Sequence, residues 1–333
     1  MARSDADRPP KPVVAYLLAA SHSGSTLLAI LLGSHPDVCT TGELKATSLG
    51  DPERYRCSCG APIRQCAFWR DIAARMAARG HAFDITQAAT HISTGATPYV
   101  RRLLQPLVRG SALETLREAG LGLAPSWHTR VAEFHALNAS LVGSVCDATG
   151  ARVVVDSSKV GIRLKYLLRN PALDVRVIRV VRDGRAVALT YIDPANFADA
   201  TAPHLRGGGN GESRDRERLS PLDAAHEWRR SNEEAAAIVA GLDPSQYTTV
   251  TYEELCADTA AVLRRLWAFL GVAPRQFGPG WRSRSQHVIG NGMRLDSTEA
   301  VRLDERWRRA LTPAALKVFE AEAGDLNRQL GYR

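Results

Sequence analysis

The sequence predicts an α/β fold with a parallel sheet flanked by helices, because three segments each place a short apolar strand before a turn and a helix. The strands are expected at residues 13–18, 152–155 and 175–181, where Val, Leu and Ile predominate. Strands that alternate with helices are typical of a parallel sheet, whose strands are joined by helical crossovers. We therefore expect one doubly wound sheet.

The first of these segments carries a loop of small residues. "VVAYLLAASHSGSTLL" passes from the strand through Ser and Gly to a helix expected at residues 26–34. Such a loop aims backbone N–H groups at a phosphate. Against the pattern G-x-x-x-x-G-K-[ST], Gly24, Ser25 and Thr26 take the last three places, so Ser25 stands where lysine is usual. The fold is therefore predicted to be P-loop-like, with a ligand that carries fewer phosphate charges at that point than a nucleoside triphosphate.

The second strand ends in Asp156, and the third precedes a helix that begins near Gly184. In "ARVVVDSSKVGIRLKYLLRN" the helix after the "DSSK" turn is expected to end at Asn170, before Pro171. An apolar strand that ends in Asp is also the pattern of magnesium-binding aspartates in P-loop enzymes. Because Asp is a favoured N-cap, we expect Asp156 to cap the helix that follows.

The rest of the chain is predicted to belong to the same domain, which spans residues 13–333 after a flexible N-terminus at residues 1–12. Residues 51–149 are rich in Ala, Leu and Arg with helical periodicity, so we expect a helical insertion after the first strand–helix unit. Residues 204–221 combine a Gly run with dense charge and are predicted to form a mobile loop. Beyond it we expect a helix at 222–240, a strand at 247–252, a helix at 260–270 and a non-periodic tail at 283–296 that leads into terminal helices.

Composition indicates a soluble globular protein rather than a membrane or nucleic-acid-binding protein. Apolar residues make up 45% of the 333 residues, and the formal net charge is +8. The basic excess suits an anionic ligand, or is a compositional habit of an Arg-rich protein. The apolar run at residues 13–20 is too short to span a bilayer, so we expect a cytoplasmic protein without stable membrane insertion. The Arg residues are dispersed and aromatic residues make up only 6%, which disfavours nucleic acid as a partner.

Three of the six cysteines, Cys57, Cys59 and Cys66, lie in "CSCGAPIRQC". A zinc site normally needs four ligands, and the fourth would have to come from elsewhere in the chain. A compact loop of thiols, in which one disulfide can form, is favoured over a metal site. We expect no metal.

"SHSGSTLL" resembles the 5′-phosphosulfate loop of sulfotransferases that use 3′-phosphoadenosine 5′-phosphosulfate as donor. Motif spacing is most similar to the tyrosylprotein sulfotransferase branch and to bacterial relatives. The resemblance implies that the loop holds the 5′-phosphosulfate through backbone N–H groups and hydroxyls, at the N-terminus of a helix. By position, the residues concerned are Ser23, Gly24, Ser25, Thr26 and Leu27.

A second motif, "VVRDGRAVALT", resembles the family's 3′-phosphate element, in which an Arg at a strand end and a hydroxyl eight residues later hold the phosphate. Arg182 and Thr190 have this spacing, although the family more often carries Ser at the second place. "TYEELCADTAAVLRRLWAFLGV" and "HVIGNGMR" are similar to later segments, of which the second closes over the nucleotide. The resemblance thereby implies three further donor contacts, Tyr252, Asn291 and Arg294.

Transfer of a sulfuryl group to a hydroxyl needs a base and positive charge around the transferring group. Glu43 matches the glutamate base of the tyrosylprotein branch and follows the first helix in "TTGEL". His22 stands where the family carries Arg or Lys; protonated it could replace that cation, and neutral it could itself be the base. Lys159 resembles the transition-state lysine, and Ser285 resembles a serine that supports the same oxygens.

The predicted function is therefore transfer of a sulfuryl group from 3′-phosphoadenosine 5′-phosphosulfate to a hydroxyl of a small-molecule, carbohydrate or lipid acceptor, with 3′-phosphoadenosine 5′-phosphate as product. No metal is needed, and tyrosine peptides are disfavoured for a cytoplasmic protein. The alternative is a P-loop-type kinase of a small metabolite that uses ATP and magnesium. The sequence leaves the acceptor and the oligomeric state open.

Overall fold

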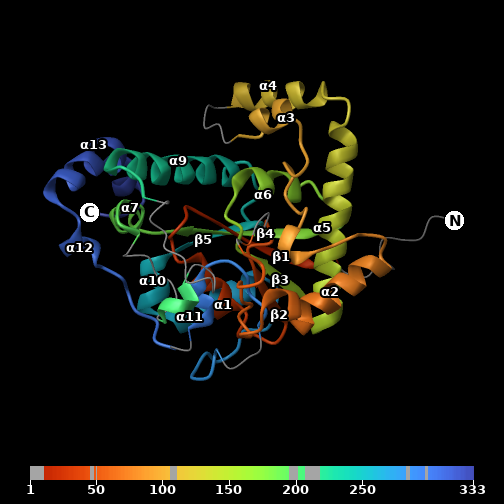
Figure 1. The fold of residues 1–333 in the computed structure, drawn as a ribbon. Coiled ribbons are helices and arrows are strands. Elements are labelled where there is room, and N and C mark those ends of the chain that lie inside the picture. The colour runs from red at the N-terminus through yellow and green to blue at the C-terminus, as the bar shows by residue number, and fades with distance from the viewer. Residues whose placement is uncertain are drawn as a thin grey trace.

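The computed structural model describes residues 11–45, 49, 51–105, 111–194, 202–206, 218–282, 286–296 and 299–333. Within these residues, five parallel strands form one sheet in the order β2-β3-β1-β4-β5 (Figure 1). The predicted class, a P-loop-like parallel sheet flanked by helices, is confirmed. The strands are β1 (Val13–Ala19), β2 (Val38–Gly42), β3 (Val153–Asp156), β4 (Asp174–Val181) and β5 (Tyr247–Thr251).

The central strand β1 is buried on both faces, as a strand inside a parallel sheet requires. Tyr16 and Leu18 belong to one hydrophobic core, whereas Leu17 and Ala19 belong to the other. The first core contains apolar residues of α5 (Trp127–Thr149), α6 (Gly161–Leu167) and α9 (Pro221–Val239), and the second contains those of α1 (Ser25–Leu32) and α11 (Thr259–Phe269). Helices therefore cover both faces of the sheet (Figure 1).

Helices follow the strands in the order that the sequence predicts. Ser220 caps α9 by accepting a hydrogen bond from the N–H of Asp223, and Asp183 caps α7 through the N–H of Arg185. The C-terminal helix α13 packs against α9 and α7, where Phe319 contacts Trp228. The bounds are α1 (Ser25–Leu32), α6 (Gly161–Leu167), α7 (Gly184–Ile192), α9 (Pro221–Val239), α10 (Tyr252–Ala257), α11 (Thr259–Phe269), α12 (Trp307–Ala310) and α13 (Pro313–Gln329).

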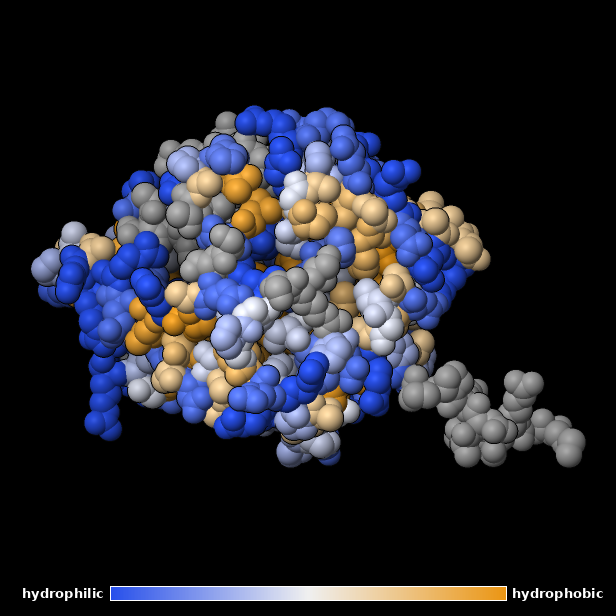
Figure 2. Space-filling view, turned by 90° about the horizontal axis from the view of Figure 1, so that it is seen from below, coloured by the Kyte–Doolittle hydropathy of each residue, from blue (hydrophilic) through white to orange (hydrophobic). Residues whose placement is uncertain are grey.

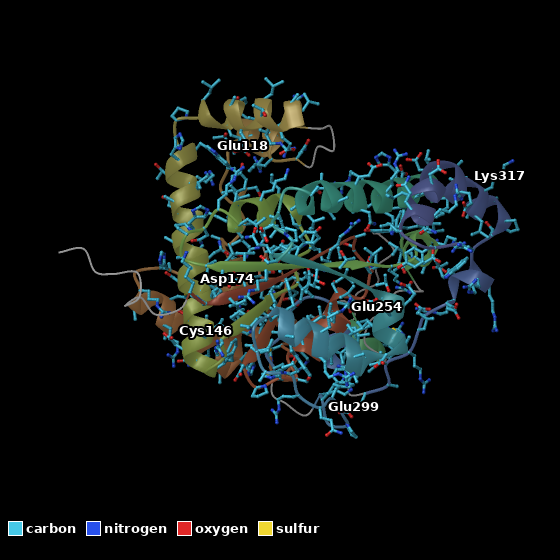
Figure 3. All side chains as sticks on the ribbon, turned by 180° about the vertical axis from the view of Figure 1, so that it is seen from behind. Glu118, Cys146, Asp174, Glu254, Glu299 and Lys317 are labelled. Carbon is cyan, nitrogen blue, oxygen red and sulfur yellow. The ribbon has the colours of Figure 1, made fainter. Side chains whose placement is uncertain are left out.

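Between β2 and β3 the chain forms α2 (Ala67–Ala78), α3 (Pro98–Leu103), α4 (Ser111–Gly122) and α5 (Trp127–Thr149). The long helix α5 packs against α2 and the sheet, and α3 and α4 lie beyond one of its ends (Figure 1). Seen from behind, Cys146 on α5 lies beside the sheet near Asp174, whereas Glu118 on α4 lies away from the sheet (Figure 3). The segment predicted as a helical insertion therefore contributes a layer at one side of the sheet.

Two features differ from the sequence analysis. The strand β2 was not predicted, because "VCTTG" is short and half polar, and its pairing with β3 comes from the fold rather than from a local pattern. The N-cap prediction for Asp156 is wrong. The helix α6 begins at Gly161, and the Asp156 carboxylate instead accepts hydrogen bonds from the N–H of Ser158 and from Arg163.

Some predicted features lie outside the residues that the structure describes. These are residues 1–10 of the predicted N-terminal segment, residues 207–217 of the predicted mobile loop, and Ser285. In the described part of the chain, no helix combines the length and the apolar character needed to cross a membrane. From below, hydrophobic residues form separate groups among hydrophilic ones (Figure 2).

Candidate functional site

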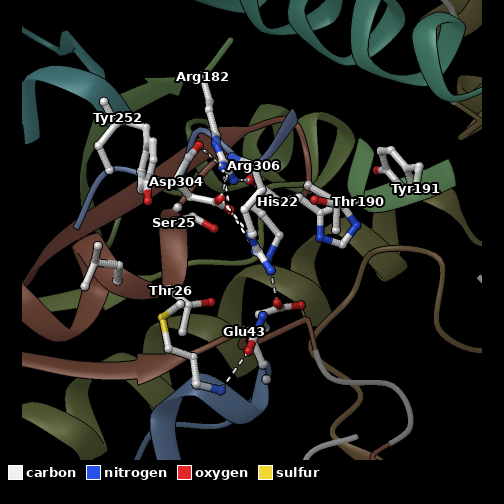
Figure 4. Close-up of a pocket in the computed structure, with 18 of the residues that line it drawn as sticks. His22, Ser25, Thr26, Glu43, Arg182, Thr190, Tyr191, Tyr252, Asp304 and Arg306 are labelled. Carbon is white, nitrogen blue, oxygen red and sulfur yellow. Dashed lines mark hydrogen bonds and ion pairs between the residues drawn. The ribbon is translucent and has the colours of Figure 1, made fainter. Parts of the chain in front are cut away.

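A cavity of about 1050 Å³ opens at the carboxyl ends of the strands, the edge where parallel α/β sheets bind ligands. Most of the residues predicted for the site point into it (Figure 4). Eleven predicted residues line it, namely His22, Gly24, Ser25, Thr26, Leu27, Glu43, Lys159, Arg182, Thr190, Tyr252 and Asn291.

The loop between β1 and α1 presents uncapped backbone to the cavity. His22 and Gly24 both have left-handed backbone conformations, with φ of 66° and 85°, which turn the chain sharply into the helix. Gly24 is the N-cap of α1, and a Cβ atom there would lie 2.5 Å from Cδ2 of Tyr252. Because glycine offers no capping side chain, the N–H groups of the first turn of α1 are available to an anion. The hydroxyl of Ser23 is buried without a hydrogen-bond partner among the described residues, but Ser23 does not line the cavity.

Glu43 and Lys159 form an ion pair at the ends of the neighbouring strands β2 and β3. Nζ of Lys159 lies 2.5 Å from Oε1 of Glu43, and Nζ of Lys45 lies 3.6 Å from Oε2. Burial by itself would raise the pKa of Glu43, but the two ammonium groups outweigh it and lower the pKa below its usual value. The carboxylate is therefore ionised at neutral pH, as a proton acceptor must be, and it lies beside two cations.

Arg182, at the carboxyl end of β4, is nearly buried and its guanidinium connects three parts of the site. It donates to the backbone oxygen of His22 at 2.9 Å and to Oδ2 of Asp304 at 3.1 Å. Its guanidinium also lies over the ring of Tyr252, 4.4 Å from the centroid. The Asp304 carboxylate therefore pairs with Arg182, the arginine that was predicted to bind a phosphate.

Asp304 is held by a second arginine. Two nitrogens of Arg306 lie 2.8 Å from its two carboxylate oxygens. Burial would raise the pKa of Asp304, but the hydrogen bonds of Arg306 and the charge of Arg182 hold it well below its usual range. These two arginines and the carboxylate form what we call the Asp304 cluster (Figure 4).

Two hydroxyls of the site, those of Thr190 and Tyr252, already donate hydrogen bonds to backbone oxygens. Thr190 donates to the backbone oxygen of Ala186 at 3.3 Å, within its own helix. The hydroxyl of Tyr252 donates to the backbone oxygen of Arg302 at 3.0 Å, and burial raises the pKa of Tyr252, so the phenol stays protonated. Both oxygens retain lone pairs for further hydrogen bonds.

Of the two donor contacts predicted in the tail segment, Asn291 lines the cavity and Arg294 does not. Asn291 lines the cavity, and its side chain accepts from the N–H of Met293. Arg294 is not among the described residues that line the cavity, because its guanidinium donates to the backbone oxygens of Gly290 and Arg56 and lies over the Tyr55 ring. Arg294 therefore holds the tail segment against the loop around Tyr55 and Arg56.

His22 lies against Tyr191, with the two rings edge to face and 4.6 Å between centroids. This placement keeps the imidazole at the cavity without deciding between the base and the cation. Several lining residues were not predicted, namely Lys45, Tyr191, Glu227, Arg302, Asp304 and Arg306. The signal for the last three was the dense charge of "VRLDER", which no local pattern connects to the first strand.

Comparison with known proteins agrees with this geometry. The profile described as "Sulfotransferase family" matches residues 16–276. Carbohydrate sulfotransferase 5 of Mus musculus is 30% identical over 176 residues, which are 50% of this chain and 44% of that protein. Carbohydrate sulfotransferase 6 of Homo sapiens is 31% identical over 177 residues, again 50% and 44%. The chain thus spans less than half the length of the curated relatives it matches.

Among solved structures, mouse sulfotransferase SULT7A1 complexed with PAP superimposes with a TM-score of 0.45 at 14% identity, over 98% of this chain and 90% of that one. The family match extends from β1 beyond α11 and includes the phosphate loop, Glu43 and Arg182. It favours the sulfotransferase interpretation over a kinase. The chain belongs to the sulfotransferase family.

Proposed function

We propose that this sulfotransferase uses 3′-phosphoadenosine 5′-phosphosulfate as donor and a carbohydrate hydroxyl as acceptor. The observation that carries the proposal is the convergence of the uncapped loop at α1, Arg182 and the Glu43–Lys159 pair on one cavity. The names of the curated relatives support the choice of a carbohydrate. A small-molecule or lipid hydroxyl is the other acceptor class to be tested.

The residues present fit such a donor. The absence of a Cβ atom at Gly24 leaves room for the ring of Tyr252, and the N–H groups of Ser25 and Thr26 in the first turn of α1 would hold a phosphosulfate. Arg182 would offer a guanidinium fork to the 3′-phosphate once the Asp304 carboxylate releases it, and Thr190, which lines the same cavity, would offer its hydroxyl.

Glu43 would take the proton of the acceptor hydroxyl as the new oxygen–sulfur bond forms and the bond from sulfur to the phosphate oxygen breaks. Lys159 would then stabilise the negative charge that develops on the bridging oxygen, from its position 2.5 Å from the base. His22 is the second candidate for the base, because it lines the same cavity.

Transfer of labelled sulfate from the donor to a panel of sugars, phenols and lipid alcohols tests the proposal. We expect labelled sugar with the wild type and little with Glu43→Gln. A thermal-shift titration with 3′-phosphoadenosine 5′-phosphate and, separately, ATP with magnesium checks the donor, because a ligand that binds the native state raises the unfolding midpoint. Stabilisation by ATP and magnesium alone would overturn the donor assignment, and transfer to phenols or lipid alcohols but not to sugars would overturn the acceptor. The cytoplasmic location remains a prediction.

A further inference from the structure

Outside the cavity, four potential metal ligands from two distant segments meet. Cys57, Cys59 and Cys66 come from the loop before α2, and His287 comes from the tail segment more than 200 positions later. The three sulfur atoms and a ring nitrogen of His287 all lie within 4.8 Å of one another. The histidine supplies the fourth ligand that the cysteine spacing alone lacked.

The distances within this cluster are close to the edges of a coordination tetrahedron. A zinc ion with bonds of about 2.3 Å to sulfur and about 2.0–2.1 Å to nitrogen separates two sulfurs by roughly 3.8 Å and a sulfur from a nitrogen by roughly 3.6 Å. Sγ of Cys59 and Cys66 are 3.7 Å apart. Nδ1 of His287 lies 3.7 Å from Sγ of Cys57 and 3.3 Å from Sγ of Cys66.

Backbone and aromatic groups around the cluster hold its sulfurs and its imidazole in place. Backbone N–H groups of Cys59 and Trp69 donate to the sulfurs of Cys57 and Cys66, respectively. The ring of Phe68 stacks on the ring of His287 at 4.4 Å with 6° between the planes. Outer partners of this kind orient metal ligands and are part of a metal site.

We propose that Cys57, Cys59, Cys66 and His287 bind one zinc ion in a closed, structural Cys₃His site. Four protein ligands leave no open position for substrate, so the ion would have no part in the transfer chemistry. The sequence analysis favoured a loop of thiols in which one disulfide can form. Such a disulfide would use only two of the sulfurs and would not account for the third sulfur and the imidazole at the same place.

Zinc bound here would hold the tail segment at residues 287–290 in place beside the cavity. Next to the ligands, Ser58 and Val288 exchange hydrogen bonds of 3.2 Å and 2.8 Å. Ile289 then joins the end of β2 through its N–H, 3.0 Å from the oxygen of Thr41. Gly290 follows directly beside Glu43, so close that a Cβ atom on it would lie 3.1 Å from Cγ of the glutamate. The site therefore positions the segment that borders the Glu43 side of the cavity.

Metal analysis of the 333-residue chain, purified under reducing conditions with zinc in the medium, tests the proposal. We expect one zinc per chain by mass spectrometry, and cobalt substitution should give the visible absorption of a tetrahedral thiolate site. Cys66→Ser and His287→Ala should each weaken zinc binding by more than the 10- to 100-fold that loss of an outer partner costs. Cys146→Ser, which alters a half-buried thiol on α5 outside the cluster, is the matched control and should bind zinc like the wild type.

The wild type alone also decides the question if a variant does not fold. A chelator should lower its unfolding midpoint, and added zinc should restore it, because the ion binds the native state. The proposal is overturned if the wild type carries no zinc and shows no tetrahedral cobalt spectrum, if Cys146→Ser loses the metal to the same extent as the ligand variants, or if alkylation before reduction shows a disulfide among the three cysteines of the protein as purified.

Discussion

Replacing Glu43 by Gln tests the proposed base, because glutamine keeps the shape of the side chain and removes its basicity. General base catalysis contributes about 10²- to 10⁴-fold, so kcat should fall by that factor. This corresponds to about 2.7–5.4 kcal/mol of activation free energy. The affinity for 3′-phosphoadenosine 5′-phosphate, measured by calorimetry, should stay near the wild-type value, because the 3′-phosphate is assigned to Arg182 and the 5′-phosphate to the loop at α1.

The structure also requires a check of stability for this variant. Glu43 pairs with Lys159, whose side chain is only 11% exposed, and loss of one partner of a buried pair costs up to about 3–5 kcal/mol. An amide oxygen still accepts a hydrogen bond from Lys159, so we expect a smaller loss. Urea unfolding measures it, and kcat is then referred to folded protein. Glu227→Gln is the matched control, because Glu227 lines the same cavity but pairs with Arg230, and its kcat should change little.

The pH profile separates the two candidate bases. Because the lysines lower the pKa of Glu43, a glutamate base stays ionised, and active, until the pH falls below the usual glutamate value of about 4.3. A histidine base would instead lose activity below about pH 6.5. If Glu43→Gln keeps kcat within about threefold while His22→Gln abolishes turnover without loss of donor affinity, our assignment of Glu43 is refuted.

Three further predictions concern the loop and the Asp304 cluster. Arg182→Lys keeps the charge but loses the guanidinium fork, so the affinity for 3′-phosphoadenosine 5′-phosphate should fall by about ten- to a hundredfold in calorimetry; an equal loss for adenosine 5′-phosphosulfate would contradict the 3′-phosphate assignment. Asp304→Asn removes the carboxylate that competes for Arg182 and should raise the same affinity by about tenfold; unchanged or weaker binding would show that the cluster supports the site rather than blocks it. Gly24→Ala should destabilise the fold by about 1–3 kcal/mol in urea unfolding, because its φ is 85° and its Cβ atom would collide with Tyr252; an unchanged midpoint would contradict the close approach.

Much of the site could be predicted because its residues lie where parallel strands end. The loop after β1, Arg182 after β4 and Lys159 after β3 follow apolar runs, and a parallel sheet brings such positions to one edge. The confirmed family and fold class rest on these local patterns. The roles of the individual residues stay predictions.

The features that could not be predicted depend on contacts that lie outside a single helix or strand. Whether Asp156 caps a helix or pairs with a buried arginine is decided by Arg163, which reaches back across a turn to it. Asp304 and His287 reach their partners only because the C-terminal tail crosses the ends of the strands. Sequence patterns describe neighbours along one element, so contacts of this kind carry no local signal.

The arrangement of charge in the cavity bears on the place of His22, since histidine stands where the resemblance implies a permanent cation. Lys45 and Lys159 lie beside the single carboxylate of Glu43, and in the Asp304 cluster two arginines again face one carboxylate. Each group thus has an excess of one positive charge, and the two groups lie in different parts of one cavity (Figure 4). Two separate cationic excesses suit a ligand with two separate anionic groups, such as a 3′-phosphate and a 5′-phosphosulfate, better than they suit the contiguous phosphates of ATP. For the proposed donor, positive charge around the transferring group would come from the ends of β2 and β3, and His22 stays a candidate for either role.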